Sequence, residues 1–476
     1  MPGGTTGAKP GLKRVLGLWA LVVYGIILVQ PTAAMPLYGN VAEKAHGHVV
    51  TTILIGMVAM LFTAISYGRM ANAYPTAGSA YSYVGQELHS SLGYLTGWAM
   101  VFDYVLNPII SVIWCSKAAM NLIPELPYPV WAIFFALLFT GLNLRGIKAS
   151  ARTNQWMAGG LTVVVVVFLL AAIRYIWTIA DPSPGRFLLP FYNPKTFSLP
   201  AVSHGASLAM LTYIGFDAIS TLSEEAHNPR RNILLATVLT CLITGILCGA
   251  QVYAAQLVWP SNEGFRDPDT AFVDVAGRAG ESLPISIGRY SGGAILFLSV
   301  NLALLVAQTG SGAGAHLAAG RLLYGMGRDN AIPSRFFAAL TPRTCIPRNN
   351  IVLVGGLALA GAFAVSYGDG CEMLNFGALI GFMGVNLSAF VRYFLRGNRR
   401  NLMNLVLPIT GFLICLYLWW NLSQLAKIVG IIWLSTGFLY GAWKTNWFRR
   451  KIAFTVPDEE TIAVPPSPQD PQEPSK

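Results

Sequence analysis

Long apolar runs, separated by short polar segments, dominate the chain. A helix needs about 20 consecutive apolar residues to cross the hydrocarbon core of a bilayer. Twelve runs approach or exceed that length, and we predict a membrane-spanning helix in each of them. The predicted spans are 15–38, 49–72, 93–123, 128–144, 154–178, 201–222, 232–257, 290–318, 350–366, 373–395, 403–420 and 423–442.

The composition favours a membrane protein over a soluble one. Of the 476 residues, 54% are hydrophobic and only 11% are charged, whereas about 25% of the residues of soluble proteins are charged. Lys13 and Arg14 precede the first apolar run, as in a signal peptide, but eleven later spans favour a retained first helix. The six cysteines form no C-x-x-C pair, so we expect neither a disulfide framework nor a zinc site.

The basic residues predict the orientation of the chain. With a cytoplasmic N-terminus, 23 of the 32 Lys and Arg residues fall in cytoplasmic segments, seven in outer loops and two within spans. Because cytoplasmic loops are enriched in Lys and Arg, both termini are predicted to be cytoplasmic. The net charge of +11 is therefore an orientation signal. It forms no concentrated basic face that would indicate nucleic-acid binding.

Two spans carry helix-breaking residues inside their apolar runs. Pro31 and Pro36 lie in the first span, where each removes a backbone hydrogen bond. Gly215 lies at the centre of the sixth span. The two spans are five helices apart, as a five-plus-five repeat requires, and secondary transporters often bind substrate where two such helices unwind. Two merely kinked helices are the alternative, because Pro and Gly are frequent in membrane spans.

Asp103 is the clearest ionisable residue within a predicted span. A charge at that depth costs at least about 2.5–3.5 kcal/mol on insertion scales, so it calls for an explanation. Asn107 and Trp114 extend the same helix face, and Pro108 frees the carbonyl of Tyr104. An acid, an amide, a free carbonyl and aromatic rings together suit an ammonium group. The alternative is an Asp that is protonated, or bonded to a neighbouring helix, purely for packing.

Other ionisable residues near the spans have a structural explanation beside the functional one. Asp217 follows the Gly215 break, where it would face the cavity or the cytoplasmic gate, or cap the second half-helix at its positive end. Lys117 lies near the outer end of the third span and can extend to the interface. Glu224 and Glu225 end the sixth span as an interfacial charge cluster or a gate. No phosphate loop, catalytic triad or metal-binding motif appears, so enzyme chemistry has no candidate site.

Four ordered segments resemble the signatures of amino acid–polyamine–organocation permeases. They are Tyr67 to Tyr83 after the second span, Asn143 to Lys148 after the fourth, Gly215 to Arg230 in and after the sixth, and Arg321 to Pro333 after the eighth. The resemblance spans about residues 15–445. It implies a five-plus-five inverted repeat with discontinuous helices one and six and two trailing helices. It also implies secondary transport of an amino acid or amine, without ATP.

Within that superfamily, Phe102 to Pro108 looks most like putrescine-importer-type permeases. Many relatives have a Gly/Ser-rich first break, whose amides hold the carboxylate of an amino acid. Here the break is Gln30-Pro31-Thr32-Ala33-Ala34, which suits an amine that lacks a carboxylate. Some proton-coupled relatives carry a lysine in helix five, but no Lys or Arg lies between Arg152 and Arg174. We expect no cofactor, and either H⁺ or Na⁺ is a possible coupling ion.

The predicted protein is thus an all-α polytopic membrane protein with 12 transmembrane helices. Its transporter domain, 15–445, holds repeat one (15–178), repeat two (201–395) and helices eleven and twelve (403–442), between a cytoplasmic segment 1–14 and a disordered tail 446–476. We expect a monomer or homodimer in the plasma membrane that binds a small amine or amino acid and no nucleic acid. The predicted substrate-binding residues are Gln30, Thr32, Ala33, Asp103, Tyr104, Asn107, Tyr213, Ile214, Gly215, Phe216 and Asp217.

Import of a polyamine or amino acid by alternating access, with cation coupling, is the favoured function. A neutral amino acid symporter and an amine–amino acid exchanger on the same fold are the alternatives. A non-transporting receptor is disfavoured because the tail of about 20 residues leaves no room for a folded signalling domain. A channel is disfavoured because no repeated filter sequence appears.

The orientation can be tested with single cysteine labels. A membrane-impermeant thiol reagent should react with cysteines placed in 262–282 on intact cells, because that segment lies in a predicted outer loop. Cysteines at 343–348 should react only after permeabilisation. The reverse pattern would contradict the predicted orientation of the whole chain.

Overall fold

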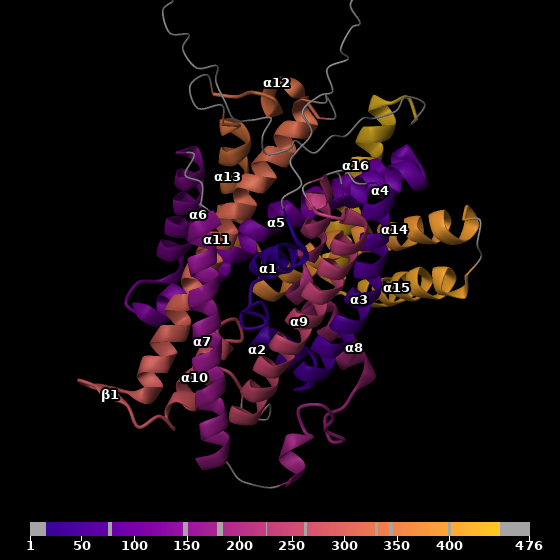
Figure 1. Ribbon diagram of the computed structural model, residues 1–476. Helices are drawn as coiled ribbons and strands as arrows, with labels where there is room; N and C mark the ends of the chain where they lie inside the picture. Colours follow the sequence, from indigo (N-terminus) through magenta and orange to yellow (C-terminus); the bar gives the residue numbers. More distant parts are fainter. Residues whose placement is uncertain are drawn as a thin grey trace, which may run out of the picture.

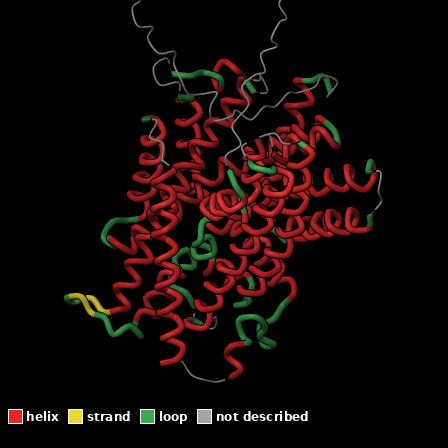
Figure 2. Tube along the Cα trace, viewed as in Figure 1, coloured by secondary structure: helices red, strands yellow, loops and turns green. Residues whose placement is uncertain are grey.

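The computed structural model describes residues 16–74, 79–145, 151–178, 184–224, 226–260, 264–328, 332–341, 346–397 and 401–447. The predicted cytoplasmic segment 1–14, Glu225 and all of the predicted tail after residue 447 lie outside these ranges. Figure 2 shows helices through almost the whole described chain, with strand confined in it to one short hairpin.

The described chain forms the following elements in order. Those of the first half are α1 (Leu18–Val29), α2 (Tyr38–Lys44), α3 (Val49–Ala73), α4 (Ser79–Glu87), α5 (Ser90–Leu122), α6 (Tyr128–Leu144), α7 (Ala151–Thr178), η1 (Pro184–Phe187), α8 (Leu199–Ala209), η2 (Met210–Tyr213) and η3 (Phe216–Glu224). Those of the second half are α9 (Pro229–Val258), α10 (Ala271–Gly280), β1 (Ser286–Ile287), β2 (Tyr290–Ser291), α11 (Gly292–Arg328), α12 (Ser334–Phe337), α13 (Arg348–Ala364), α14 (Tyr367–Phe390), η4 (Val391–Leu395), α15 (Leu402–Trp420) and α16 (Gln424–Lys444).

Eight described helices are long and apolar enough to cross a membrane, namely α3, α5, α7, α9, α11, α14 with η4, α15 and α16. The helices α1, α6 and α13 are also apolar but shorter. Large apolar side chains stay exposed on the outside of the bundle, among them Leu137, Leu170 and Trp177, as contact with lipid requires. The prediction of a polytopic helical membrane protein is confirmed. Twelve spans and an inverted repeat stay predictions.

Small residues let the helices approach closely at the centre of the bundle. The long helix α5 packs on α11 and α14, and α3 packs on α9. A Cβ added to Gly377 of α14 would lie 2.5 Å from the carbonyl oxygen of Ala99 on α5. A Cβ on Gly68 of α3 would meet the backbone of Leu234 on α9 at the same distance. Such close backbone approach is typical of membrane helices, where dispersion contacts replace the hydrophobic effect as the source of helix–helix attraction.

Figure 1 shows two landmarks at opposite ends of α11. The antiparallel hairpin β1–β2 projects at the lower left, with Ile287 paired to Tyr290. Its turn uses Gly288 at φ +59°, a conformation that glycine adopts without strain. The short helix α12 lies at the top, beyond the other end of α11. These landmarks mark the two faces of the bundle that the predicted orientation assigns to the outside and the cytoplasm.

The α5–α14 contact provides a test of the packing. Gly377→Ala should lower the free energy of unfolding by about 1–3 kcal/mol, because the added methyl group meets a backbone oxygen that cannot turn away. Thermal unfolding of the purified protein in detergent measures the effect. In the matched control, Gly356→Ala on α13, nothing lies within 4 Å of the new Cβ. Equal stability of the two variants would contradict this packing.

Candidate functional site

The interruption predicted in the first span is present. The helix α1 ends at Val29, Gln30 adopts φ +70°, and α2 begins only at Tyr38. The carbonyl of Pro31 accepts a hydrogen bond of 2.7 Å from Nε2 of Gln251 on α9. A buried glutamine therefore satisfies a backbone group that the break would otherwise leave unpaired in an apolar environment.

The interruption predicted in the sixth span is present as well. After α8 the chain forms the 3₁₀ turn η2, and Ile214 is then extended. Gly215 adopts φ +116°, and η3 begins at the next residue. At nine residues η3 is long for a 3₁₀ helix, and stretches of this kind often mark hinges. A Cβ on Gly215 would lie 3.6 Å from the carbonyl of Leu28. The two breaks therefore lie side by side.

The two aspartates identified in the sequence lie near each other but differ in their surroundings. The carboxylate of Asp217, in the first turn of η3, accepts hydrogen bonds from backbone amides at the break, including that of Ala218. Asp103 on α5 is half-buried and interacts electrostatically with Asp217. No hydrogen bond or ion pair to its carboxylate occurs among the described residues. Asp217 thus caps the second half-helix, whereas Asp103 has no comparable partner among the described residues.

Aromatic rings surround this acidic pair. Tyr104 interacts electrostatically with both aspartates and with Tyr24 of α1. Phe216 is fully buried, with ring centroids 5.5 Å from Tyr67 of α3 and 5.5 Å from Phe382 of α14. These rings form a closed apolar layer directly after the Gly215 break. We use the term central site for Gln30–Ala33, Asp103–Asn107 and Ile214–Asp217.

Not every predicted residue points into the central site. The Tyr213 hydroxyl donates to the carbonyl of Ile53 at 2.7 Å, so this polar group bonds to α3. Thr32 is buried, whereas Ala33 and Ile214 are half-buried. Asn107 accepts a weak hydrogen bond of 3.4 Å from Ser111 on its own helix. The structure brings Asp103, Tyr104, Gly215, Phe216 and Asp217 together around the Gln30 break.

Two residues near the outer end of α5 take part in a separate cluster. The indole of Trp114, considered as a cation–π wall, is buried and donates to the carbonyl of Asp269 at 2.7 Å. Lys117 forms ion pairs of 3.1 Å with Asp267 and 2.5 Å with Asp269, rather than extending alone to the interface. Burial raises the pKa of the Asp269 carboxyl, and the Lys117 ammonium opposes that shift. This cluster joins α5 to the loop before α10.

Sequence reasoning missed a buried acid. Glu372 lies one residue before the predicted span 373–395, so it was not counted among the acids within the membrane. In the structure its side chain is fully buried and pairs with Lys44 and His204. An acid flanked by apolar residues in Cys371-Glu372-Met373-Leu374 was the signal that could have revealed it.

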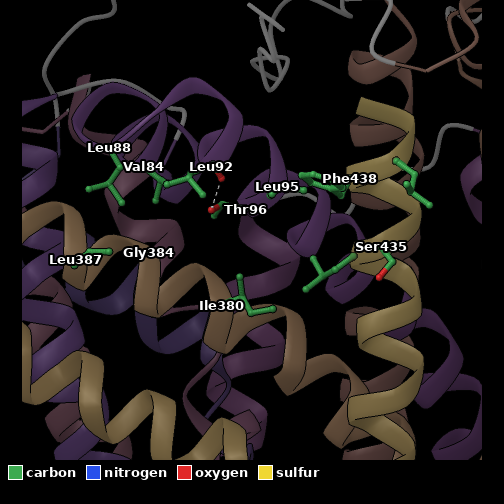
Figure 3. Close-up of a pocket in the computed structure, with 12 residues that line it drawn as sticks. Val84, Leu88, Leu92, Leu95, Thr96, Ile380, Gly384, Leu387, Ser435 and Phe438 are labelled. Atoms are coloured by element: carbon green, nitrogen blue, oxygen red, sulfur yellow. Dashed lines mark hydrogen bonds between the residues drawn. The ribbon is translucent and has the colours of Figure 1, made fainter. Parts of the chain in front are cut away.

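An apolar groove of about 650 Å³ lies between α4, α5, α14 and α16 (Figure 3). Only Thr96 and Ser435 among its lining residues carry a polar side chain. The Thr96 hydroxyl already donates to the carbonyl of Leu92 at 2.9 Å, the dashed line in Figure 3. With no charged lining residue the groove does not suit an amine, so it is distinct from the central site.

A mostly helical membrane protein in which two broken helices meet beside an acid has the arrangement found at the binding sites of many membrane transporters. The family model for amino acid permeases matches residues 20–448. The chain is 31% identical to the low-affinity putrescine importer PlaP of Escherichia coli, over 95% of this chain and 97% of the importer. It is 27% identical to the methylthioribose transporter of Bacillus subtilis (90% of this chain, 92% of the other) and 26% identical to the branched-chain amino acid permease BcaP of Lactococcus lactis (90% and 95%).

The chain therefore belongs to the amino acid permease family. It is a multi-pass membrane transport protein and not an enzyme. The family resemblance found in the four sequence motifs is confirmed.

The break in the sixth span provides a test of the central site. Gly215→Leu should abolish uptake while leaving the amount of protein in the membrane near normal, because an L side chain is strained at φ +116° and would fill the space beside Leu28. Radiolabelled uptake, normalised to surface expression, measures the effect.

Gly314→Leu on α11 is the matched control, because nothing lies within 4 Å of its new Cβ. Normal uptake by Gly215→Leu would show that this segment does not line the site. A parallel loss in both variants would show a general effect of the larger side chain.

Proposed function

We propose that this permease imports a polyamine of the putrescine class across the plasma membrane by alternating access. Two separate facts support the proposal. The relative PlaP, which aligns over almost the whole chain, is described as a putrescine importer. The central site contains a carboxylate, Asp103, with no partner of its own among the described residues. That free carboxylate is the observation on which the proposal depends.

The chemistry of the central site favours a cation. An unpaired carboxylate within an apolar bundle is costly, and an ammonium group would offset that cost by ion pairing. Asp217 adds a second negative charge within electrostatic range. Tyr104 supplies an aromatic ring beside both acids, and the face of such a ring attracts cations. In this arrangement one ammonium group pairs with Asp103, and Phe216 closes over the ligand.

The breaks themselves offer little to the carboxylate of an amino acid. In the first break the amides of Gln30, Ala33 and Met35 donate to carbonyls of the chain. Pro31 has no amide hydrogen, and the amide of Ala34 faces the thiol of Cys248. In the sixth span the amides at the break serve the Asp217 carboxylate. A ligand without a carboxylate therefore suits this site better than an amino acid does.

A neutral amino acid symporter is the second candidate, and an amine–amino acid exchanger is a variant of it. Its support is the similarity to BcaP, a branched-chain amino acid permease, over 90% of this chain. In that case the substrate carboxylate would bind at the amides of the breaks, and Asp103 would carry a coupling proton or serve packing.

The remaining parts of the proposal concern architecture and energy source. The eight long helices, the three shorter apolar helices and the broken segment α8–η3 would form twelve spans with an inverted repeat over the first ten. Both termini would lie in the cytoplasm, in line with the distribution of Lys and Arg. H⁺ or Na⁺ would drive accumulation, in a monomer or homodimer.

Asp103→Asn separates the candidate functions. The change keeps the shape and removes the charge, so loss of a desolvated charge pair should weaken diamine binding by about 2–5 kcal/mol, at least thirtyfold. Binding, counterflow and accumulation of putrescine and leucine should be measured for both proteins in proteoliposomes.

The other outcomes identify the alternatives. A mutant that still binds and exchanges substrate, but fails to concentrate it and loses its pH dependence, would assign Asp103 to a coupling proton. A parallel loss of both substrates and of protein yield would assign it to packing. Unchanged diamine affinity and unchanged accumulation would contradict the polyamine proposal.

A further inference from the structure

Glu372, near the start of α14, contacts the segments next to both helix breaks, α2 after the first break and α8 before the second. Its fully buried carboxylate forms an ion pair with Lys44, the last residue of α2. The same oxygen lies 3.2 Å from Nε2 of His204 on α8. The other oxygen accepts a hydrogen bond from the backbone amide of Ser423, which precedes α16. One carboxylate thus contacts α2, α8 and the start of α16.

Lys44 and His204 lie on the two segments that adjoin the helix breaks. The helix α2 follows the break at Gln30, and α8 precedes the break at Gly215. These two segments pack on each other, and α8 packs on α14. The helix α2 is held a second time where Asn40 donates to Asp269 at 2.7 Å, within the Lys117 cluster. The segments flanking the central site on this side are therefore fastened to the bundle by polar contacts.

We propose that Glu372 is a positioning residue for transport, which holds α2 and α8 against α14 in the conformation that is closed on the outer side. The inference rests on the proposed alternating-access function, in which these segments must separate from the bundle to admit substrate. We name Glu372, Lys44 and His204 the outer latch. Because Glu372 is 0% exposed and removal of its partners would leave an unpaired buried charge, opening requires the carboxylate to gain water or a proton.

Several polar groups surround the carboxylate of Glu372 among the described residues. Lys44 from α2, His204 from α8 and the Ser423 amide face it. Cys371 and Tyr367 lie beside it on α14. Loss of any one of the facing partners leaves the buried carboxylate less well satisfied and should favour opening.

Cys371 is a native reporter of this opening. Its thiol is fully buried next to Glu372 in the closed arrangement. A membrane-impermeant thiol reagent applied to intact cells, followed by mass spectrometry of the peptide, measures how often Cys371 becomes accessible. Glu372→Gln should raise the labelling rate roughly tenfold or more, because a desolvated charge pair is lost. Lys44→Gln should act in the same direction and serves as the second variant if Glu372→Gln fails to fold.

A control and a third variant make the result specific. Asp369→Asn removes an acid one turn away whose carboxylate accepts a hydrogen bond from the nearby Ser366, and labelling of Cys371 should stay at the wild-type rate. His204→Gln removes the partner on α8, and it should raise the labelling rate as Lys44→Gln does.

Folded Glu372→Gln and Lys44→Gln proteins with wild-type labelling of Cys371 would overturn the proposal. Wild-type labelling of Cys371 in His204→Gln would remove His204 from the outer latch. The measurement needs no substrate, so an error in the proposed substrate would leave the labelling result unchanged. Conversely, the wild-type protein could bind putrescine while the latch variants show wild-type labelling of Cys371. That result would overturn the outer latch and leave the proposed substrate in place.

Discussion

The need to pair backbone polar groups within an apolar bundle is the constraint on which this structure depends. Breaking a helix inside a membrane frees carbonyls and amides that lipid cannot satisfy. In this chain Gln251 reaches from α9 to the carbonyl of Pro31, and the Asp217 carboxylate takes the amides at the second break. At each break, therefore, a side chain forms hydrogen bonds with backbone groups that the interrupted helix leaves unpaired.

Hydrogen-bond partners also distinguish two acids that look alike in the sequence. Asp103 and Asp217 are both aspartates in apolar runs, and in the folded chain they interact with each other. The carboxylate of Asp217 accepts hydrogen bonds from backbone amides at the start of η3, which stabilises the positive end of that half-helix. Asp103 has no comparable partner among the described residues. This difference in partners is what distinguishes Asp103 as the candidate cation-binding group in the proposed function.

Local signals made much of the fold predictable from sequence, and contacts between distant segments were not. Apolar length located the long helices, and Pro31 and Gly215 located both breaks, because each of these features depends on neighbouring residues only. The hydrogen-bond partners of Tyr213 and Trp114 belong to other segments of the chain. The hydrophobic periodicity of a helix does not show which segment packs against it. The Glu372–Lys44 pair joins residues 328 positions apart. Its acid lies one residue before the predicted span 373–395, so a count of acids within the spans omits it although apolar residues flank it.

The two ends of the central site are closed by different kinds of contact. On the η3 side, Phe216 packs among Tyr67 and Phe382, and dispersion contacts of this kind depend little on pH or salt. On the side of α2 and α8, closure depends on a buried carboxylate and its cationic partners. Ion pairs lose strength whenever water, protons or salt reach them. The contacts on the side of α2 and α8 are therefore the more sensitive of the two to salt and to water entry. Gly215, at φ +116°, lies between these two sets of contacts, so the two halves of the sixth span are held to the bundle by different kinds of interaction.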